Sequence, residues 1–138
     1  MNGYLLDTHA WIWAQTAEPG RFSAEMRKQL EKSQAQRRLY LSAISILEVA
    51  RLVSLGQQFL PTSVDDFVAA GLGDDGLVLL EMTPRILIDS TRLPGELHRD
   101  PADRILVATA RAHGLTLVTR DKQLLAYSKQ SHLNARKP

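Results

Sequence analysis

Short apolar runs alternate with longer, helix-like stretches along this chain. Runs of strand length, each followed by polar or turn residues, occupy residues 4–6, 39–41, 77–80 and 115–118. Stretches rich in helix formers, several of them preceded by a capping Ser or Asp or ended by a Gly, lie at 22–35, 45–55, 64–70, 85–93, 102–113 and 122–128. The pattern predicts strands and helices that alternate from end to end.

This alternation indicates an α/β fold with a central, mainly parallel sheet flanked by helices in three layers, because each pair of parallel strands needs a crossover connection. No internal repeat or Gly/Ser linker interrupts the sequence, so we expect one domain over residues 1–138, with 129–138 as a flexible C-terminal tail. No apolar run approaches the length of a membrane span, and the N-terminus lacks the basic start of a signal peptide.

Composition removes several classes of function. The chain has no cysteine, which excludes disulfides, thiolate metal sites and cysteine catalysis and fits a cytoplasmic protein. Its net charge of +2 is too small to indicate a nucleic-acid-binding protein by itself. The charge is uneven, however, because residues 98–138 hold eight basic and three acidic side chains. The C-terminal third is therefore the basic end.

Four acidic residues lie where ligands gather in a parallel sheet. The carboxyl ends of parallel strands meet at one edge, where helix N-termini also point. Each of the four follows a different predicted strand and lies at or near the start of the next helix: they are Asp7, Glu48, Asp103 and Asp121. Carboxylates that converge would repel one another unless cations neutralise them. Oxygen-only ligands suit Mg²⁺ or Mn²⁺.

Helix capping is the alternative explanation for these acids. Asp7, Asp100 and Asp121 stand where N-cap residues stand, and Ser45 and Glu48 have the spacing of a capping box. Taken singly, each acid is explained at least as well by such a structural role. Independent caps need not converge, so it is the joint pattern that favours a metal site.

Four segments, in this order along the chain, resemble the PIN-domain ribonucleases, especially the VapC toxins of prokaryotic toxin–antitoxin pairs. They are LLDTHAWIW, LSAISILEVARLVSLG, HRDPADRILVATARAHG and LTLVTRDKQLLAY, and each carries one of the four acids. Their conjunction is far more specific than any one segment. Ala102 departs from the pattern, since many of these toxins carry a bulky aromatic there, and residues 57–97 match weakly.

The resemblance implies a PIN-like domain that hydrolyses RNA phosphodiester bonds with Mg²⁺ or Mn²⁺ and leaves a 5′-phosphate and a 3′-hydroxyl. The acidic cluster that binds the metal and catalyses the reaction in this family falls on Asp7, Glu48, Asp103 and Asp121. Auxiliary positions fall on Thr8, Asp100 and Thr119. The resemblance also implies a homodimer and a cognate antitoxin protein as partner.

An acidic pocket needs nearby cations to hold RNA phosphates. The candidates flank the acids in sequence and are Arg99, Arg104, Arg120 and Lys122. Solvated helix ends and surface ion pairs explain these cations equally well. Trp11 and Trp13 alternate along WIW, so we expect at least one of them in the core, while the other could stack on a base at the pocket rim. The four histidines lack metal-ligand spacing, and we interpret them as surface or local hydrogen-bonding groups.

Three other functions stay open at this point. The chain could be a free-standing PIN ribonuclease that processes RNA. A receiver-like phosphoacceptor domain is also a small α/β unit with Mg²⁺-binding acids, but it needs an adjacent acidic pair after the first strand, where this chain has Asp7 alone. A non-catalytic module that binds RNA or a protein partner would use the acids as caps. Its binding would survive an Asp7→Asn substitution, whereas a nuclease would lose cleavage.

Overall fold

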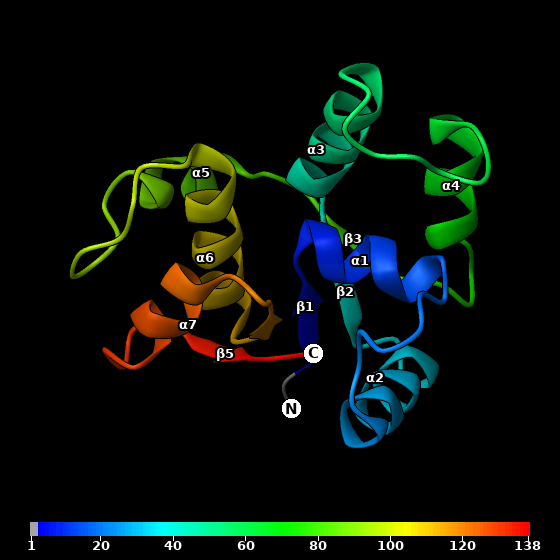
Figure 1. Cartoon of the computed structure of the whole chain (residues 1–138). Coiled ribbons are helices and arrows are strands. Elements are labelled where there is room, and N and C mark those ends of the chain that lie inside the picture. Colours follow the sequence, from blue (N-terminus) through cyan, green and yellow to red (C-terminus); the bar gives the residue numbers. More distant parts are fainter. Residues whose placement is uncertain (1–2) are drawn as a thin grey trace.

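The computed structural model describes residues 3–138, in which five parallel strands form one sheet in the order β3-β2-β1-β4-β5 (Figure 1). The strands are β1 (Tyr4–Leu6), β2 (Leu39–Ser42), β3 (Val78–Leu80), β4 (Thr116–Val118) and β5 (Asn134–Arg136). The helices are α1 (Thr8–Gln15), α2 (Ala24–Ala35), α3 (Ala43–Ser54), α4 (Val64–Gly71), α5 (Pro84–Ser90), α6 (Pro101–His113) and α7 (Lys122–Ser128).

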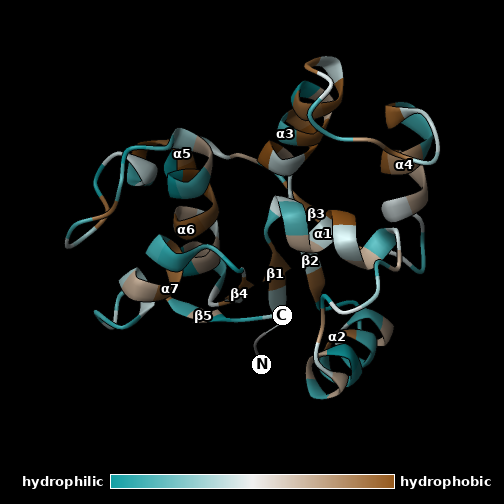
Figure 2. Ribbon diagram, in the orientation of Figure 1, coloured by the Kyte–Doolittle hydropathy of each residue, from teal (hydrophilic) through white to brown (hydrophobic). Residues whose placement is uncertain are grey.

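Helices cover both faces of the sheet and give the three layers that the sequence predicts. Side chains alternate along the central strand β1, so Leu6 packs with Trp11 of α1 on one face while Leu5 packs with Leu106 of α6 on the other. Figure 1 shows α1, α2 and α4 on one side and α5, α6 and α7 on the other. In Figure 2 the central strand β1 is brown, which marks hydrophobic residues, whereas the edge strand β5 is teal, which marks hydrophilic ones. The α/β, mainly parallel fold is therefore confirmed.

The expectation of a flexible tail over residues 129–138 is wrong, because part of this segment forms a strand of the sheet. Asn134–Arg136 pairs in parallel with β4, and the Thr119 N–H donates to the Arg136 carbonyl at 3.0 Å. Leu133, just before the strand, is buried in the core. An edge strand reading Asn-Ala-Arg carries no apolar run, so the hydrophobic pattern could not reveal it.

Helix α1 was absent from the predicted elements. Its residues Ala10, Trp11 and Ile12 are consecutive and all buried, so the helical period of apolar positions is lost. Asp7 caps it, and β1 ends one residue earlier, so the chain turns from strand to helix at this carboxylate. Within the described residues, none of the helices is long and apolar enough to cross a membrane.

Candidate active site

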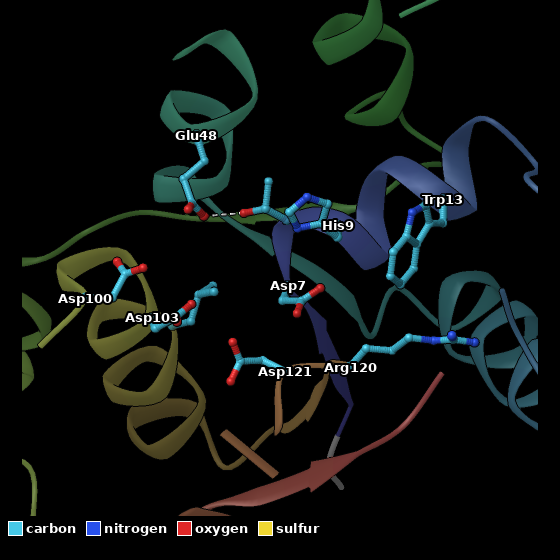
Figure 3. A pocket seen from close by; sticks show the side chains of 10 residues that line it. Asp7, His9, Trp13, Glu48, Asp100, Asp103, Arg120 and Asp121 are labelled. Atoms are coloured by element: carbon cyan, nitrogen blue, oxygen red, sulfur yellow. Dashed lines mark hydrogen bonds between the residues drawn. The ribbon is translucent and has the colours of Figure 1, made fainter. Parts of the chain in front are cut away.

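A pocket of about 460 Å³ lies at the carboxyl edge of the sheet (Figure 3). The first turns of α1 and α7 meet there because each helix begins directly after a central strand or one short turn beyond it. Carboxylates from four helices line it: they are Asp7, Glu48, Asp100, Asp103 and Asp121. The structure thus brings together the four acids that the sequence singled out, and Asp100 with them.

Three of these acids also cap helices. Asp7 Oδ1 accepts the N–H of Ala10 at 2.8 Å, and Oδ1 of Asp100 and of Asp121 accepts helix N–H groups at 2.8 to 3.0 Å. The capping interpretation is correct for them, but these bonds engage Oδ1 and leave Oδ2 outside the cap. A carboxylate can therefore fix a helix start and still offer an oxygen to the pocket.

Glu48 has no capping role, so the capping-box interpretation is wrong. Helix α3 begins earlier than expected, with Ser42 as its N-cap, which places Glu48 in the second turn. Its carboxylate accepts a hydrogen bond from the Thr8 hydroxyl, and Thr8 is also bonded to the Ser45 hydroxyl at 2.9 Å. Thr8 and Ser45 are both buried, so this arrangement holds a half-buried carboxylate at the pocket wall.

The acids perturb one another electrostatically. Burial is the largest cause that raises the pKa of Asp7, of Glu48 and of Asp103. For Asp103 the pKa rises to about 7, and the negative charges of Asp100, Asp121, Glu48 and Asp7 all add to the effect of burial. The ionised form of Asp103 is thus repelled by all four other carboxylates of the pocket. Excess negative charge of this kind is what a bound cation would offset.

Thr119 connects two of the acids. This fully buried residue hydrogen-bonds the Asp7 carboxylate through its side chain, which lowers the pKa of Asp7 against the effect of burial. Its hydroxyl also accepts the N–H of Asp121 at 3.0 Å. Thr8 and Thr119, the two hydroxyl residues that the resemblance suggested as auxiliaries, therefore each contact an acid of the cluster.

The donor set fits a hard divalent cation. Among residues 3–138, no three acidic or histidine side chains stand close enough, as oriented, to hold a metal ion. The oxygens of Asp7, Glu48, Asp103 and Asp121 are nevertheless the ligand type that Mg²⁺ and Mn²⁺ prefer. These four residues supply the carboxylate oxygens that would hold such an ion.

Of the four cations predicted to bind RNA, only one lines the pocket. Arg120 lines the pocket, whereas Arg99 and Lys122 are exposed but do not line it. The Arg104 guanidinium turns inward and donates to the carbonyls of Ser90 at 2.7 Å, Leu97 at 3.0 Å and His98 at 3.4 Å. Arg104 thus fixes the connection between α5 and α6. Its guanidinium is engaged by backbone carbonyls and not directed at the pocket, where an RNA phosphate was expected to bind it.

Two histidines and one tryptophan join the site. Trp11 is fully buried, as expected of one of the pair, while Trp13 is half-buried and lines the pocket together with His9. The spacing of His9 and Trp13 puts them on one helix face, a feature that the sequence contained but that needed α1 to be recognised. His98 Nε2 lies 3.2 Å from Asp103 Oδ2, buried and without hydrogen-bond geometry. His98 therefore contacts the acidic cluster and is not the surface or hydrogen-bonding group that the sequence suggested.

Comparison with known proteins identifies related sequences. The sequence pattern of the PIN domain matches residues 4–130. Ribonuclease VapC22 of Mycobacterium tuberculosis is 31% identical over 127 residues, which cover 92% of this chain and 93% of that protein.

Solved structures show the same fold. The chain resembles DNA-bound VapBC from Salmonella typhimurium, with a TM-score of 0.66, 19% identity and coverage of 99% of this chain and 98% of that one. It also resembles VapBC2 from Rickettsia felis bound to a fragment of its promoter DNA, with a TM-score of 0.69, 16% identity and 97% coverage of both chains. Both the match over residues 4–130 and the relative with 31% identity therefore establish that this chain belongs to the PIN domain family.

Proposed function

We propose that this protein is a Mg²⁺- or Mn²⁺-dependent endoribonuclease and the toxin of a toxin–antitoxin pair. The observation that carries the proposal is the convergence of five carboxylates on one pocket, with the pKa of Asp103 raised to about 7 by burial and by the other four. Membership of the PIN domain family and the likeness to a protein named ribonuclease support the same activity.

The acidic side chains of the pocket and the hydroxyl groups that contact them then have distinct roles. Asp7, Glu48, Asp103 and Asp121 would hold the ion, which when bound acidifies water and offsets the charge of the phosphate under attack. Thr8 orients Glu48, and Thr119 orients Asp7, so the carboxylates stay in place as a substrate enters. Asp100 caps α6 and adds its charge beside Asp103. Such hydrolysis leaves a 5′-phosphate and a 3′-hydroxyl.

Proteins of similar fold suggest the partner. The neighbours from Salmonella typhimurium and Rickettsia felis are VapBC complexes, and FitAcB from Neisseria gonorrhoeae is a further neighbour with a TM-score of 0.62. We expect a cognate antitoxin to bind this chain and to place a cationic side chain among its carboxylates, as the charge of the pocket favours. We also expect the protein to form a homodimer and to act in the cytoplasm.

Cleavage of labelled RNA tests the proposal. Purified protein is incubated with single-stranded RNA in Mg²⁺, in Mn²⁺ and in EDTA, beside an Asp7→Asn variant. The matched control is Asp65→Asn, which neutralises an exposed acid in the first turn of α4, away from the pocket. We expect cuts only with a divalent ion, a loss of about 100-fold or more for Asp7→Asn, and none for the control.

Other results would redirect the proposal. RNA binding without cleavage in either metal, and unchanged in Asp7→Asn, would favour a non-catalytic module. Cleavage without growth arrest when the gene is expressed, and with no antitoxin neutralising it, would favour a free-standing ribonuclease.

A further inference from the structure

The pocket has two chemically different sides. Figure 3 shows Asp100, Asp103 and Glu48 on one side and Trp13 with Arg120 on the other, while Asp7 and Asp121 lie between. The acidic side can hold a cation but repels a phosphodiester strand. An RNA substrate therefore needs attractive contacts from the opposite side of the same pocket.

Trp13 is the centre of that opposite side. The Arg21 guanidinium carbon lies 4.4 Å from the centroid of the Trp13 indole, and that of Arg120 lies 5.6 Å away. The His9 ring lies one helical turn before it, with ring centroids 5.9 Å apart. Arg120 Nη2 also donates to the Arg21 carbonyl at 3.3 Å, which joins the loop after α1 to the loop after β4. The result is a cluster of planar aromatic and cationic groups, in which Arg21 Nη2 also donates to the Glu18 carboxylate at 3.2 Å.

Core packing does not account for this cluster. Trp11, two residues earlier, is fully buried and fills the core position, whereas Trp13 is half-buried. Arg120 is exposed, and within residues 3–138 its guanidinium donates the single hydrogen bond to the Arg21 carbonyl. A guanidinium has five N–H groups, so Arg120 keeps donors for a phosphate. Stacked Trp and Arg planes suit an unpaired nucleobase, because every base has a flat aromatic face that can stack on them.

A second cavity lies directly beyond the indole. It has a volume of about 510 Å³, is mostly apolar, and runs between the end of α1 and α2, where Phe22 and Pro19 line it together with Trp13. Trp13 lines both this cavity and the acidic pocket. A base that leaves the acidic pocket along the strand would therefore meet the indole and then an apolar hollow.

We propose that Trp13, Arg21 and Arg120 form a subsite for the nucleotide next to the scissile phosphate of single-stranded RNA. The base stacks on the indole and guanidinium planes, and Arg120 contacts a neighbouring phosphate. This inference rests on the proposed function for the position of the cut, but the subsite binds RNA without metal or cleavage. Duplex RNA is excluded from it because its bases are already stacked and paired.

Tryptophan fluorescence tests stacking directly. Trp11 and Trp13 are the two tryptophans of the chain, and Trp11 is shielded in the core, so quenching by a ligand reports on Trp13. A short single-stranded RNA is titrated into the wild-type protein in EDTA, beside the same strand with abasic ribonucleotides and beside its duplex. We expect quenching by the intact single strand and little by the other two.

Variants separate stacking from charge. Trp13→Leu should weaken binding of the intact strand about 10-fold, with Trp11 emission reporting that the fold is kept, and should leave binding of the abasic strand unchanged. Arg120→Gln should reduce the dependence of log K on log salt by about 1. The matched control Arg85→Gln, at an exposed arginine of α5, should change neither.

The outcomes distinguish this subsite from the proposed function. Quenching that is absent, or equal for abasic and intact strands, overturns the subsite even if the protein cleaves RNA in Mg²⁺. An unchanged affinity of Trp13→Leu for the intact strand overturns it as well. Quenching by the intact strand, together with weaker binding of that strand by Trp13→Leu measured from the fluorescence anisotropy of labelled RNA, supports the subsite even if no RNA is cut in either metal, in which case the proposed nuclease is wrong.

Discussion

Replacing Asp103 by Asn should stabilise the metal-free protein at pH 8. Burial and the charges of four neighbouring carboxylates raise the pKa of Asp103 from its ordinary value of 3.8 to about 7. At pH 8 the group is ionised in both the folded and the unfolded chain, so the folded protein bears the full repulsion. Asn has nearly the same shape and carries no charge, and its amide can still hydrogen-bond in the pocket.

The size of the effect follows from the pKa difference. Ionising Asp103 in the fold, with the pKa moved from 3.8 to about 7, costs about 4 kcal/mol at about 1.4 kcal/mol per pKa unit. The side chain is 19% exposed, and the open pocket admits water and counterions that reduce both the burial cost and the repulsion. Asn also loses the favourable interaction of a charge with the first turn of α6, about 0.5 kcal/mol. A net gain of about 1 to 2 kcal/mol remains.

The raised pKa of Asp103 also determines how the stability difference between the variant and wild type changes with pH. A folded-state pKa above the unfolded value means that the folded chain holds the proton more tightly, so wild type loses stability as pH rises from about 4 to about 7. The variant lacks this loss. The stability difference between Asp103→Asn and wild type should therefore be near zero at pH 4 and reach its full size at pH 8.

Urea unfolding in EDTA at pH 4 and pH 8 measures the difference. Asp65→Asn is the control, because it removes an exposed first-turn acid of α4 that has no acidic pocket around it, and we expect it to lose a few tenths of a kcal/mol at pH 8. Mg²⁺ at ten times its Kd should stabilise wild type by about 1.4 kcal/mol and Asp103→Asn by less. If Asp103→Asn is no more stable than wild type at pH 8, or gains equally at pH 4, burial and carboxylate repulsion do not raise the pKa of Asp103 as described.

Three further changes test the contacts around the site. Thr8→Val removes the hydroxyl that holds Glu48, so the cleavage rate should fall about 10- to 100-fold while circular dichroism stays unchanged. Arg104→Ala leaves three carbonyls without their donor and should lower the free energy of unfolding in urea by about 2 to 4 kcal/mol, of which Arg104→Lys should restore only part. Truncation after Leu133 removes β5 and should lower the melting temperature by about 5 °C or more; an unchanged value would show that the strand contributes nothing.

The strands and helices were predictable where burial produces a recognisable run or period of apolar residues in the sequence. Strands β1, β2, β3 and β4 are short apolar runs because helices cover both faces of the sheet, and the sequence places them to within a residue or two. Edge strand β5 buries little and has no such run. Helix α1 was absent from the prediction for the opposite reason, since consecutive buried residues hide its period.

The acids of the site were predictable because topology alone brings them together. Residues that follow parallel strands meet at one edge, so Asp7 and Asp121 converge whatever their side chains do. The surroundings needed coordinates. Arg21 lies in the loop after α1, far in sequence from Asp121, and reaches the pocket rim only through Trp13 and Arg120. Nothing in the sequence separates Arg120, which lines the pocket, from Arg104, which turns inward.

The chemical ends of the RNA fragments test the central claim most directly. Hydrolysis at a carboxylate-bound metal leaves a 5′-phosphate and a 3′-hydroxyl, whereas attack by the ribose 2′-hydroxyl leaves a 2′,3′-cyclic phosphate and a 5′-hydroxyl. We predict 5′-phosphate ends in Mg²⁺ or Mn²⁺ by ligation and mass spectrometry, and no fragments from Asp7→Asn. Cyclic phosphate ends that form in EDTA and persist in Asp7→Asn would contradict the account.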